Sequence, residues 1–441
     1  MFGLINLPAT RVDKKKLPAG PIGHELAPIS RNPRLLFDDC LALPDDAIDQ
    51  GRFANVGPAD DGDDGESAHD GTLGRNENRL ESEYTCPASN MADMVERVQL
   101  AEPRGFCAGV EMAIKSLTWM VRVFEAPVYC YHEIVHNRWV VDAFERVGVI
   151  FVNSMNEVPL GAPVMLSAHG SAPEVVAAAQ ASAGVVVDAV CPLVTKVHHE
   201  VKTLTDKGFQ ILYIGHGGHD EAVGTIAEAP EHITLIEPER GLESFKAKDP
   251  TKVALLAQTT LGLFEWEDVL RQSQAEFPEL KTARKSDLCY ATTNRQEAVQ
   301  QLSTSADLVL VVGSDSSSNT RALVRVAHEA GIPAYRIDNA DAIDPEWLIG
   351  KEIVGVTAGA SAPDHLVSEV IDRINPRNGV ELIQVTKEGE YFPLPPQLRG
   401  FLTALQAVVE AGFSASNRGG RGLLEDDRSW TATEALDLIS E

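Results

Sequence analysis

The sequence predicts an α/β protein built from three quasi-equivalent domains around a pseudo-threefold axis. Two observations support this fold class. From residue 97 onward, short β-branched runs alternate with helical stretches, and three series of special residues recur along the chain at similar intervals. Repetition at a nearly fixed step is the mark of repeated structural units, so the three domains are expected to bring equivalent positions together at their centre.

The β runs are short, rich in Val, Ile and Leu, and bounded by glycine or polar residues, as buried strands of α/β units are. The six runs that we predict as strands are 128–131, 164–167, 210–214, 253–256, 308–312 and 353–356. Helical patterns separate them. Three of the predicted helices are 108–120, 193–204 and 293–302.

The first repeated series consists of cysteines. Cys107, Cys191 and Cys289 lie 84 and 98 residues apart, each shortly before a predicted helix. Three domains around an axis would bring these thiols together. The other cysteines, Cys40, Cys86 and Cys130, do not follow the repeat, and we interpret them as incidental.

The other two series are polar residues that follow β runs. One contains His136, His219 and Ser317, at intervals of 83 and 98 residues, and the other contains His169, Thr259 and Gly359, at intervals of 90 and 100. A short sequence motif recurs as well, since GSAPE at 170–174 resembles ASAPD at 360–364. These turns are expected to form a ring of polar groups around the cysteines.

The repeat suggests domain boundaries, and the chain ends lie outside it. We predict an extension at 1–96, a strand with the first cysteine at 97–108, domains at 109–191, 192–286 and 287–376, and a tail at 377–441. The stretch 60–83 carries nine acidic residues against two arginines and is expected to be disordered. An amphipathic segment at 401–411 lies in the tail, whose role the sequence does not disclose.

Composition restricts the function. The 441 residues carry 38 Lys and Arg against 65 Asp and Glu, a net charge of -27, which would repel a phosphate backbone or an anionic membrane. No apolar run approaches the roughly 20 residues of a membrane span, and no secretory signal opens the chain. We therefore expect a cytoplasmic protein that binds no nucleic acid and does not span a membrane.

Three converging thiolates can hold zinc or an iron–sulfur cluster. Zinc ligands usually come in close C-x-x-C pairs, which are absent here. A 4Fe-4S cluster tolerates distant ligands, and three cysteines would leave one iron open to substrate. Three buried free cysteines at matched positions are the structural alternative.

The predicted ring of polar turns is suited to binding an anion. Parallel strands lead into helix N-termini, which point backbone N–H groups at the crevice. Neutral donors and imidazoles, not lysines, occupy the turns: His136, His169, His219, Thr259, Ser317, Ser318, Asn319 and Ser361. Glu221 follows His219 by two residues, and burial beside an anion would raise its pKa, so it is the predicted proton donor. A carboxylate stabilising a helix N-terminus is the alternative.

Five longer motifs then resemble one family. They are PRGFCAGV at 103–110, HEIVHN at 132–137, CPLVTKVH at 191–198, CYATTNRQ at 289–296 and TAGASAP at 357–363. These motifs are similar to the signature motifs of the 4-hydroxy-3-methylbut-2-enyl diphosphate reductases, and the resemblance extends over about residues 98–376.

The resemblance implies the last step of the methylerythritol phosphate route: reductive removal of an allylic hydroxyl to give isopentenyl and dimethylallyl diphosphate. It implies a 4Fe-4S cluster on Cys107, Cys191 and Cys289, and electrons from ferredoxin or flavodoxin. By motif, Glu221 would deliver protons with His219 beside it, and Thr259 would orient the hydroxyl. The residues implied to bind the diphosphate are His136, His169, His219, Thr259, Ser317, Ser318, Asn319 and Ser361.

The chain departs from the family pattern at Asp220, where proline is usual, which adds a charge beside the proposed donor. At Ser316 the family commonly has asparagine or another residue, although the Ser-Ser-Asn core that follows is kept. An acidic ferredoxin would need a basic docking patch, for which Lys281, Arg284 and Lys285 are candidates.

Two other classes of function stay open at this point. A redox-neutral iron–sulfur hydro-lyase would remove water without a reductant. A cluster-containing sensor would bind an anion and form no product.

Overall fold

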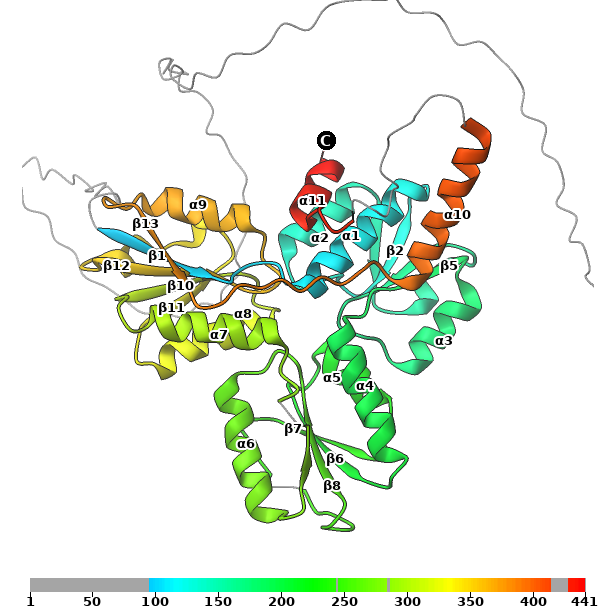
Figure 1. The fold of residues 1–441 in the computed structure, drawn as a ribbon, viewed down its shortest axis with the longest axis horizontal. Coiled ribbons are helices and arrows are strands. Elements are labelled where there is room, and N and C mark those ends of the chain that lie inside the picture. The colour runs from blue at the N-terminus through cyan, green and yellow to red at the C-terminus, as the bar shows by residue number, and fades with distance from the viewer. Residues whose placement is uncertain (1–94, 243–244, 284–285, 414–426, 441) are drawn as a thin grey trace, which may run out of the picture. The chain divides into compact units, whose positions relative to one another are not determined.

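The computed structural model describes residues 95–440 except 243–244, 284–285 and 414–426 (Figure 1). Most of the predicted N-terminal extension, with Cys40 and Cys86, lies outside the described residues, as do Arg284 and Lys285. All described residues belong to one compact unit.

Three parallel sheets with helices between their strands form the fold (Figure 1). Their strand orders are β3-β2-β4-β5, β7-β6-β8-β9 and β11-β10-β12-β1-β13. In each sheet the first strand of its own segment lies between the second and the third, and a fourth strand pairs with the third. The predicted fold of three quasi-equivalent α/β units is confirmed.

The first sheet and the helices beside it come from residues 108–188. Its strands are β2 (Val128–Tyr131), β3 (Val149–Val152), β4 (Pro163–Leu166) and β5 (Val185–Asp188). Its helices are α1 (Ala108–Val123), α2 (Arg138–Arg146) and α3 (Pro173–Ser182), with a 3-10 turn η2 (Met155–Glu157).

The second sheet repeats this order over residues 192–282. Its strands are β6 (Gln210–Ile214), β7 (Ile233–Ile236), β8 (Val253–Ala257) and the two-residue β9 (Lys281–Thr282). Its helices are α4 (Pro192–Thr205), α5 (Asp220–Ala227) and α6 (Leu263–Glu276).

The third sheet takes strands from both ends of the described chain. Its strands are β10 (Leu308–Val312), β11 (Ala334–Ile337), β12 (Ile353–Ala358), β1 (Arg97–Glu102) and β13 (Val380–Gln384). Its helices are α7 (Tyr290–Leu302), α8 (Ser318–Glu329) and α9 (Asp364–Ile374), with 3-10 turns η3 (Ala340–Ala342) and η4 (Pro345–Leu348). Strand β1 takes the fourth position of this sheet, which β5 and β9 take in the other two.

Strands β8 and β10 show why the β runs could be recognised. Every residue of both strands is buried, because the sheets are covered on both faces. Their sequences, VALLA and LVLVV, are correspondingly apolar throughout.

The segment set aside as a tail contributes to the fold. Strand β13 pairs in parallel with β1 and is the edge strand of the third sheet. Helix α10 (Pro396–Phe413) packs beside β5, and helix α11 (Ala432–Ser440) packs on α1 and α2 (Figure 1). Leu398, Leu402 and Leu436 of these helices join the buried core of the first domain. The amphipathic pattern at 401–411 thus belongs to α10. Among the described residues, no helix has both the length and the apolarity needed to cross a bilayer.

Candidate functional site

The three repeated cysteines each follow a fourth strand and precede a helix. Cys107 follows β1, Cys191 follows β5 and Cys289 follows β9, and they are the N-cap residues of α1, α4 and α7. Carboxyl ends of parallel strands meet at one edge of a sheet, where α/β proteins bind ligands. The equivalent topology of the three sheets therefore explains the spacing of the cysteines.

One cavity gathers every residue predicted for the site. It comprises about 770 Å³ of empty space, part of which is open to solvent. Its lining includes Cys107, Cys191, Cys289, His136, His169, His219, Glu221, Thr259, Ser317, Ser318, Asn319 and Ser361. Two of the repeated series thus converge on a single concave surface, together with His169, Thr259 and the turn directly after Gly359 from the third.

The thiols of Cys107 and Cys191 lie on either side of Gly109. A Cβ atom at residue 109 would lie 2.8 Å from Sγ of Cys191 and 3.8 Å from Sγ of Cys107, so only glycine fits between them. Burial, with the nearby Cys107, raises the pKa of the Cys289 thiol to about 11. Burial likewise raises the pKa of Cys191. A metal that binds here must therefore displace thiol protons.

The spacing of the sulfur atoms bears on which group they could hold. Two thiolates of one tetrahedral zinc lie about 3.8 Å apart, given Zn–S bonds of about 2.3 Å. Among the described residues, the groups whose ligand atoms all lie within 4.8 Å of one another do not include the three cysteines. The donor set, three thiols spaced more widely than one zinc ion requires, fits a larger iron–sulfur group.

Thr292, which the sequence analysis did not single out, is the polar neighbour of Cys289. Its backbone N–H donates to Sγ of Cys289 at 3.3 Å, and the hydroxyl lies 3.0 Å from the same sulfur. It stands three residues after the cysteine on the first turn of α7, a position from which an N-cap contact is expected.

Glu221 is buried and bound to Thr259. The backbone N–H of Thr259 donates to Oε1 at 2.7 Å, and its hydroxyl donates to Oε2 at 2.9 Å. Burial raises the pKa of Glu221 to about 7, although both hydrogen bonds from Thr259 act to lower it. A carboxyl group with this pKa can hold and release a proton near neutrality.

Three histidine rings from different strand ends form one group. The rings of His136 and His169 are stacked with centroids 3.9 Å apart, and the ring of His219 meets that of His136 edge-on at 5.2 Å. Burial, with the neighbouring His136, lowers the pKa of His219 to about 3. Nδ1 of His219 accepts from the backbone N–H of Glu221 at 3.2 Å, so the ring proton lies on Nε2.

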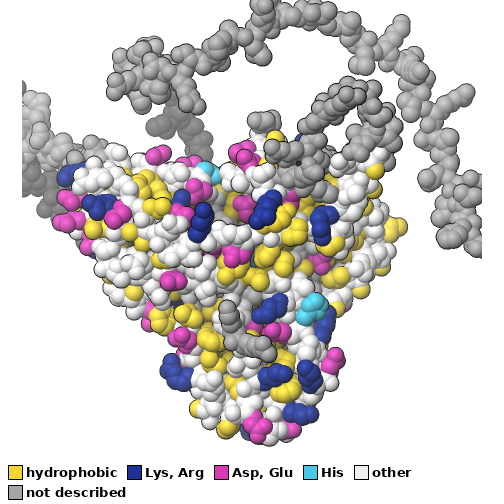
Figure 2. All heavy atoms as spheres, in the orientation of Figure 1, with side chains coloured by type: hydrophobic (Ala, Val, Ile, Leu, Met, Phe, Trp, Pro, Cys, Tyr) yellow, Lys and Arg dark blue, Asp and Glu magenta, His cyan; other side chains and the backbone are white. Residues whose placement is uncertain are grey.

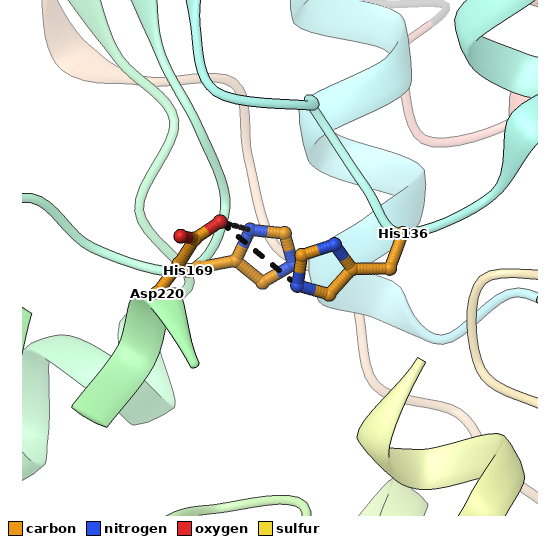
Figure 3. Close-up of side chains that lie close together, drawn as sticks. All are labelled: His136, His169 and Asp220. Carbon is orange, nitrogen blue, oxygen red and sulfur yellow. Dashed lines mark ion pairs between the residues drawn. The ribbon is translucent and has the colours of Figure 1, made fainter. Parts of the chain in front are cut away.

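Asp220, the residue that departs from the family pattern, faces these rings. Its Oδ1 lies 2.8 Å from Nδ1 of His132. Its Oδ2 lies 3.8 Å from Nδ1 of His169 and 4.0 Å from Nε2 of His136 (Figure 3). Burial opposes its ionisation, but the hydrogen bond from His132 and the nearby imidazoles lower the pKa of Asp220.

The third polar turn is held by a hydrogen bond within the turn and by others to the loops after β8 and β12. Ser317 caps α8 by accepting from the N–H of Thr320, and Ser318 Oγ accepts from Nε2 of Gln258 at 3.2 Å. The Asn319 side chain accepts from the N–H of Ala360 at 3.0 Å. Gln258, like Thr292, was not found from the sequence, because its role depends on a contact across domains.

Ser361 completes the ring from the loop after β12. Its hydroxyl donates to the backbone carbonyl of His136 at 2.9 Å, which links the third sheet to the first. The ring of polar turns predicted from the repeat is therefore assembled from all three sheets.

Comparison of this chain with known protein families and solved structures agrees with the geometry of the cavity. The family described as LytB protein matches residues 98–375. The chain belongs to the LytB protein family. It is 46% identical over 337 residues to the 4-hydroxy-3-methylbut-2-enyl diphosphate reductase of Streptomyces avermitilis, covering 76% of this chain and 98% of the relative.

Further members of the LytB family show the same similarity. The reductase of the same name from Chromobacterium violaceum is 43% identical over 311 residues, covering 69% of this chain and 99% of that protein. Among solved structures, the E-1-hydroxy-2-methyl-but-2-enyl-4-diphosphate reductase of Plasmodium falciparum superposes with a TM-score of 0.68 at 30% identity, covering 70% of this chain and 99% of that one. The resemblance stated from the five motifs is confirmed at the level of the family.

Proposed function

We propose that this protein catalyses the reductive dehydroxylation of 4-hydroxy-3-methylbut-2-enyl diphosphate to isopentenyl and dimethylallyl diphosphate. The observation that carries the proposal is the convergence of three cysteines, three histidines and the Glu221–Thr259 pair on one cavity. The names of the relatives at 43–46% identity support the same substrate and reaction.

The reaction consumes two electrons and two protons. The C–O bond of the allylic alcohol breaks, oxygen leaves as water, and a proton adds to either of two carbons of the remaining allyl group. Cys107, Cys191 and Cys289 would hold a 4Fe-4S cluster, which when bound supplies electrons and a Lewis-acidic iron.

The residues of this chain would bind the substrate and deliver protons. Glu221, with a pKa near 7, would give the proton that turns the leaving hydroxyl into water. Thr259, hydrogen-bonded to that carboxyl group, would orient the hydroxyl and pass the proton between them. His219 would offer its Nε2–H to the diphosphate, because its Nδ1 is occupied by the N–H of Glu221.

The other end of the substrate would lie among the polar turns. The diphosphate would be held by His136, His169, Ser317, Ser318, Asn319 and Ser361. Helix α8 begins within this set, and its N-terminal backbone N–H groups favour phosphate oxygens.

The electron donor would be a ferredoxin or flavodoxin that docks near the second sheet. A groove beside α4 is lined by Lys196, His199 and Lys281, by one carboxylate, Glu200, and by Pro192, which directly follows Cys191. Figure 2 shows Lys and Arg side chains gathered over the lobe that contains the second sheet. This basic surface would attract an acidic donor despite the net charge of -27. The cytoplasmic location expected from the sequence stays a prediction.

The test is anaerobic purification, with iron and sulfide counts and a turnover assay with a chemical reductant. We expect about four irons per chain and both isomeric products. Cys191→Ala should lose the cluster, whereas Cys130→Ala, which alters a buried cysteine of β2 outside the cavity, should keep it. Turnover without reductant would favour the hydro-lyase, and a bound cluster without any product would refute the reductase.

A further inference from the structure

The three cysteines differ in the side chain that stands three residues after each of them. This side chain lies in the first turn of the following helix and lines the cavity in all three domains. It is valine in the first two domains and threonine in the third, so the third differs by a hydroxyl group. The residues are Val110, Val194 and Thr292, which follow Cys107, Cys191 and Cys289.

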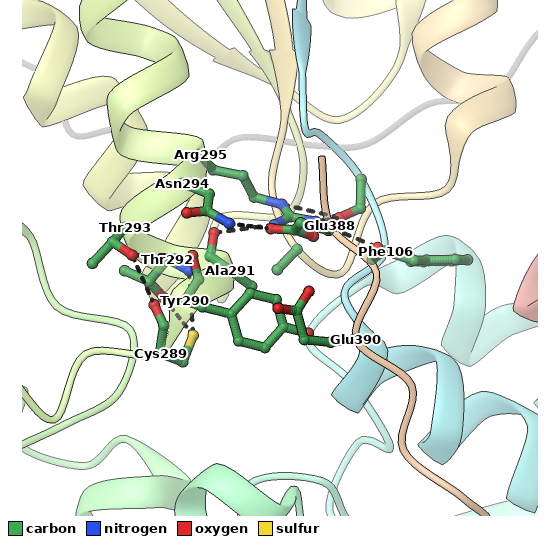
Figure 4. A network of polar contacts seen from close by, with 12 residues as sticks. Phe106, Cys289, Tyr290, Ala291, Thr292, Thr293, Asn294, Arg295, Glu388 and Glu390 are labelled. Carbon is green, nitrogen blue, oxygen red and sulfur yellow. Dashed lines mark hydrogen bonds and ion pairs between the residues drawn. The ribbon is translucent and has the colours of Figure 1, made fainter. Parts of the chain in front are cut away.

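The hydroxyl of Thr292 contacts the sulfur of Cys289. Its Oγ1 lies 3.0 Å from Sγ at the start of α7, and Thr292 is buried (Figure 4). The backbone N–H of Thr292 makes the N-cap hydrogen bond to the same sulfur at 3.3 Å, a bond that other residue types at this position could also make. The hydroxyl is therefore a second donor, which the cap of α7 does not require.

Asn319 sets the direction of the hydroxyl hydrogen bond. Its Oδ1 accepts from the N–H of Ala360 at 3.0 Å, so its amide nitrogen is the atom that lies 3.5 Å from Oγ1 of Thr292. An oxygen that accepts from Asn319 has its own hydrogen free for Sγ. A metal-bound thiolate carries no proton and can only accept, so Thr292 is then the donor to Cys289.

We infer that Thr292, acting through Cys289, raises the reduction potential of the iron–sulfur group that the cysteines would hold. The inference rests on the proposed function and adds to it a positioning residue. Hydrogen bonds to the ligand sulfurs are among the factors that set this potential, because they stabilise the negative charge that arrives with an electron. The electron comes from the proposed protein donor, and the hydroxyl keeps its proton.

The valines make the effect specific to one of the three sulfurs. Val110 and Val194 can offer no hydroxyl to Cys107 and Cys191. Thr292 is also joined through Asn319 to the polar turn at the start of α8. The sulfur with the additional donor is thus the one connected to the turn proposed to hold the diphosphate.

The test is a redox titration of anaerobically purified protein, followed by electron paramagnetic resonance of the reduced iron–sulfur group. Thr292→Val gives the third domain the side chain of the other two. It should lower the equilibrium constant for one-electron reduction about tenfold, which makes the midpoint potential about 59 mV more negative. Thr292→Ser keeps the hydroxyl and should remain closer to wild type. Iron and sulfide counts should be the same in all of these proteins.

Thr292→Ala and Val194→Ala form a matched pair that separates the hydroxyl from the change in volume. Both shorten the equivalent side chain, but only Thr292→Ala removes a donor, so only it should lower the potential. Equal potentials in wild type, Thr292→Val and Thr292→Ala would overturn the inference, as would equal shifts in Thr292→Ala and Val194→Ala. Loss of iron from both variants that lack the hydroxyl would also overturn it, because Thr292 would then serve to retain the group.

Turnover of the wild type with a chemical reductant separates the two proposals. Product formation, together with potentials that do not depend on Thr292, would refute the role of Thr292 and leave the reductase proposal standing. Potentials that depend on the Thr292 hydroxyl, without product under any reducing condition, would refute the reductase and leave the role of Thr292 standing.

Discussion

Both oxygens of the Glu221 carboxylate accept hydrogen bonds from a single residue, Thr259. The N–H of Thr259 donates to one oxygen at 2.7 Å and its hydroxyl donates to the other at 2.9 Å. The pair joins α5 to the loop after β8, so the acid is held in place at the wall of the cavity. Burial prevails over these bonds and holds the pKa of Glu221 at about 7.

Glu221→Gln should lower kcat by about 10²–10⁴-fold while KM and the iron content change little, because the amide keeps the shape but cannot donate the proton. In the wild type kcat should fall as the pH rises through about 7, since the donor must be protonated. That pH limb should vanish from the residual activity of the variant. A variant that turns over as fast as wild type would exclude Glu221 as the donor.

The titration of Glu221 should also make the stability of the folded protein depend on pH. The folded protein keeps a proton on Glu221 up to about pH 7, whereas the unfolded chain releases it near its ordinary value of 4.5. The stability conferred by proton binding is therefore fully present below about 4.5 and is lost as the pH rises through about 7. Relative to Glu221→Gln, the wild type should lose Tm between about pH 5 and pH 8. Parallel Tm curves for the two proteins would contradict the raised pKa.

Thr259→Val should change the activity by shifting the pKa of Glu221. Valine keeps the volume but removes the hydroxyl that stabilises the carboxylate, so the pKa of Glu221 should rise and the alkaline limb of kcat should move to higher pH. Thr259→Ser keeps the hydroxyl and serves as the control. A fall in kcat with an unmoved pH limb would mean that Thr259 contacts only the substrate.

Arg295, which is fully buried, connects the loop that carries Cys107 to helix α7, which follows Cys289. Its guanidinium donates to the carbonyl of Gly105 at 2.8 Å and pairs with Glu388 at 2.9 Å (Figure 4). Gly105 precedes Cys107 by two residues and has a φ of 65°, which favours glycine. Helix α7, which carries Arg295, begins directly after Cys289. The bridge thus links the loop of one cysteine to the helix of another.

Arg295→Met should destabilise the protein by about 3–5 kcal/mol, because it leaves Glu388 and the Gly105 carbonyl without their cation. It should also lower the iron content after anaerobic purification, since the Cys107 loop is no longer tied to α7. Glu388→Gln, which keeps an oxygen acceptor, should have the smaller effect on both. Unfolding in denaturant and iron counts give the two readouts, and an unchanged Tm in Arg295→Met would disprove the bridge.

The sequence predicted those features that repeat or alternate locally. The apolar runs of β6 and β10 were found at their observed bounds, and the three cysteine positions followed from topology that recurs three times. Contacts between residues that are far apart in the sequence were not predictable. Arg295 and Glu388 are 93 residues apart, and β13 joins β1 from the other end of the described chain. Nothing in the periodicity of either segment specifies such a partner.

His132 and Asp220 illustrate the same limit within the site. Asp220 was visible as a departure from the family, yet its orientation depends on His132 from the loop after β2. His132 has a φ of 59°, an unusual conformation for a residue other than glycine, which a sequence pattern does not reveal. The position of Asp220 beside the histidine rings therefore became visible only when the strand ends were assembled.

Lys115 anchors the C-terminal segment to the first domain. Its ammonium group, buried in α1, donates to the carbonyls of Asp427 at 2.8 Å and Trp430 at 3.1 Å and lies 3.4 Å from the Asp427 carboxylate. Trp430 in turn packs edge-on against Trp119. Helix α11 follows and covers α1 and α2.

Lys115→Met should cost about 3–5 kcal/mol, because the Asp427 side chain, only 4% exposed, would remain charged without its cation and keep only the hydrogen bond from the Tyr391 hydroxyl. The double variant Lys115→Met with Asp427→Asn should recover part of this loss, since it leaves no buried charge. Equilibrium unfolding of wild type, both single variants and the double variant measures the coupling. Additive losses would show that the pair contributes nothing beyond its separate side chains, and the attachment of α11 would then depend on its apolar contacts and on the hydrogen bond from the N–H of Ala432 to Glu111.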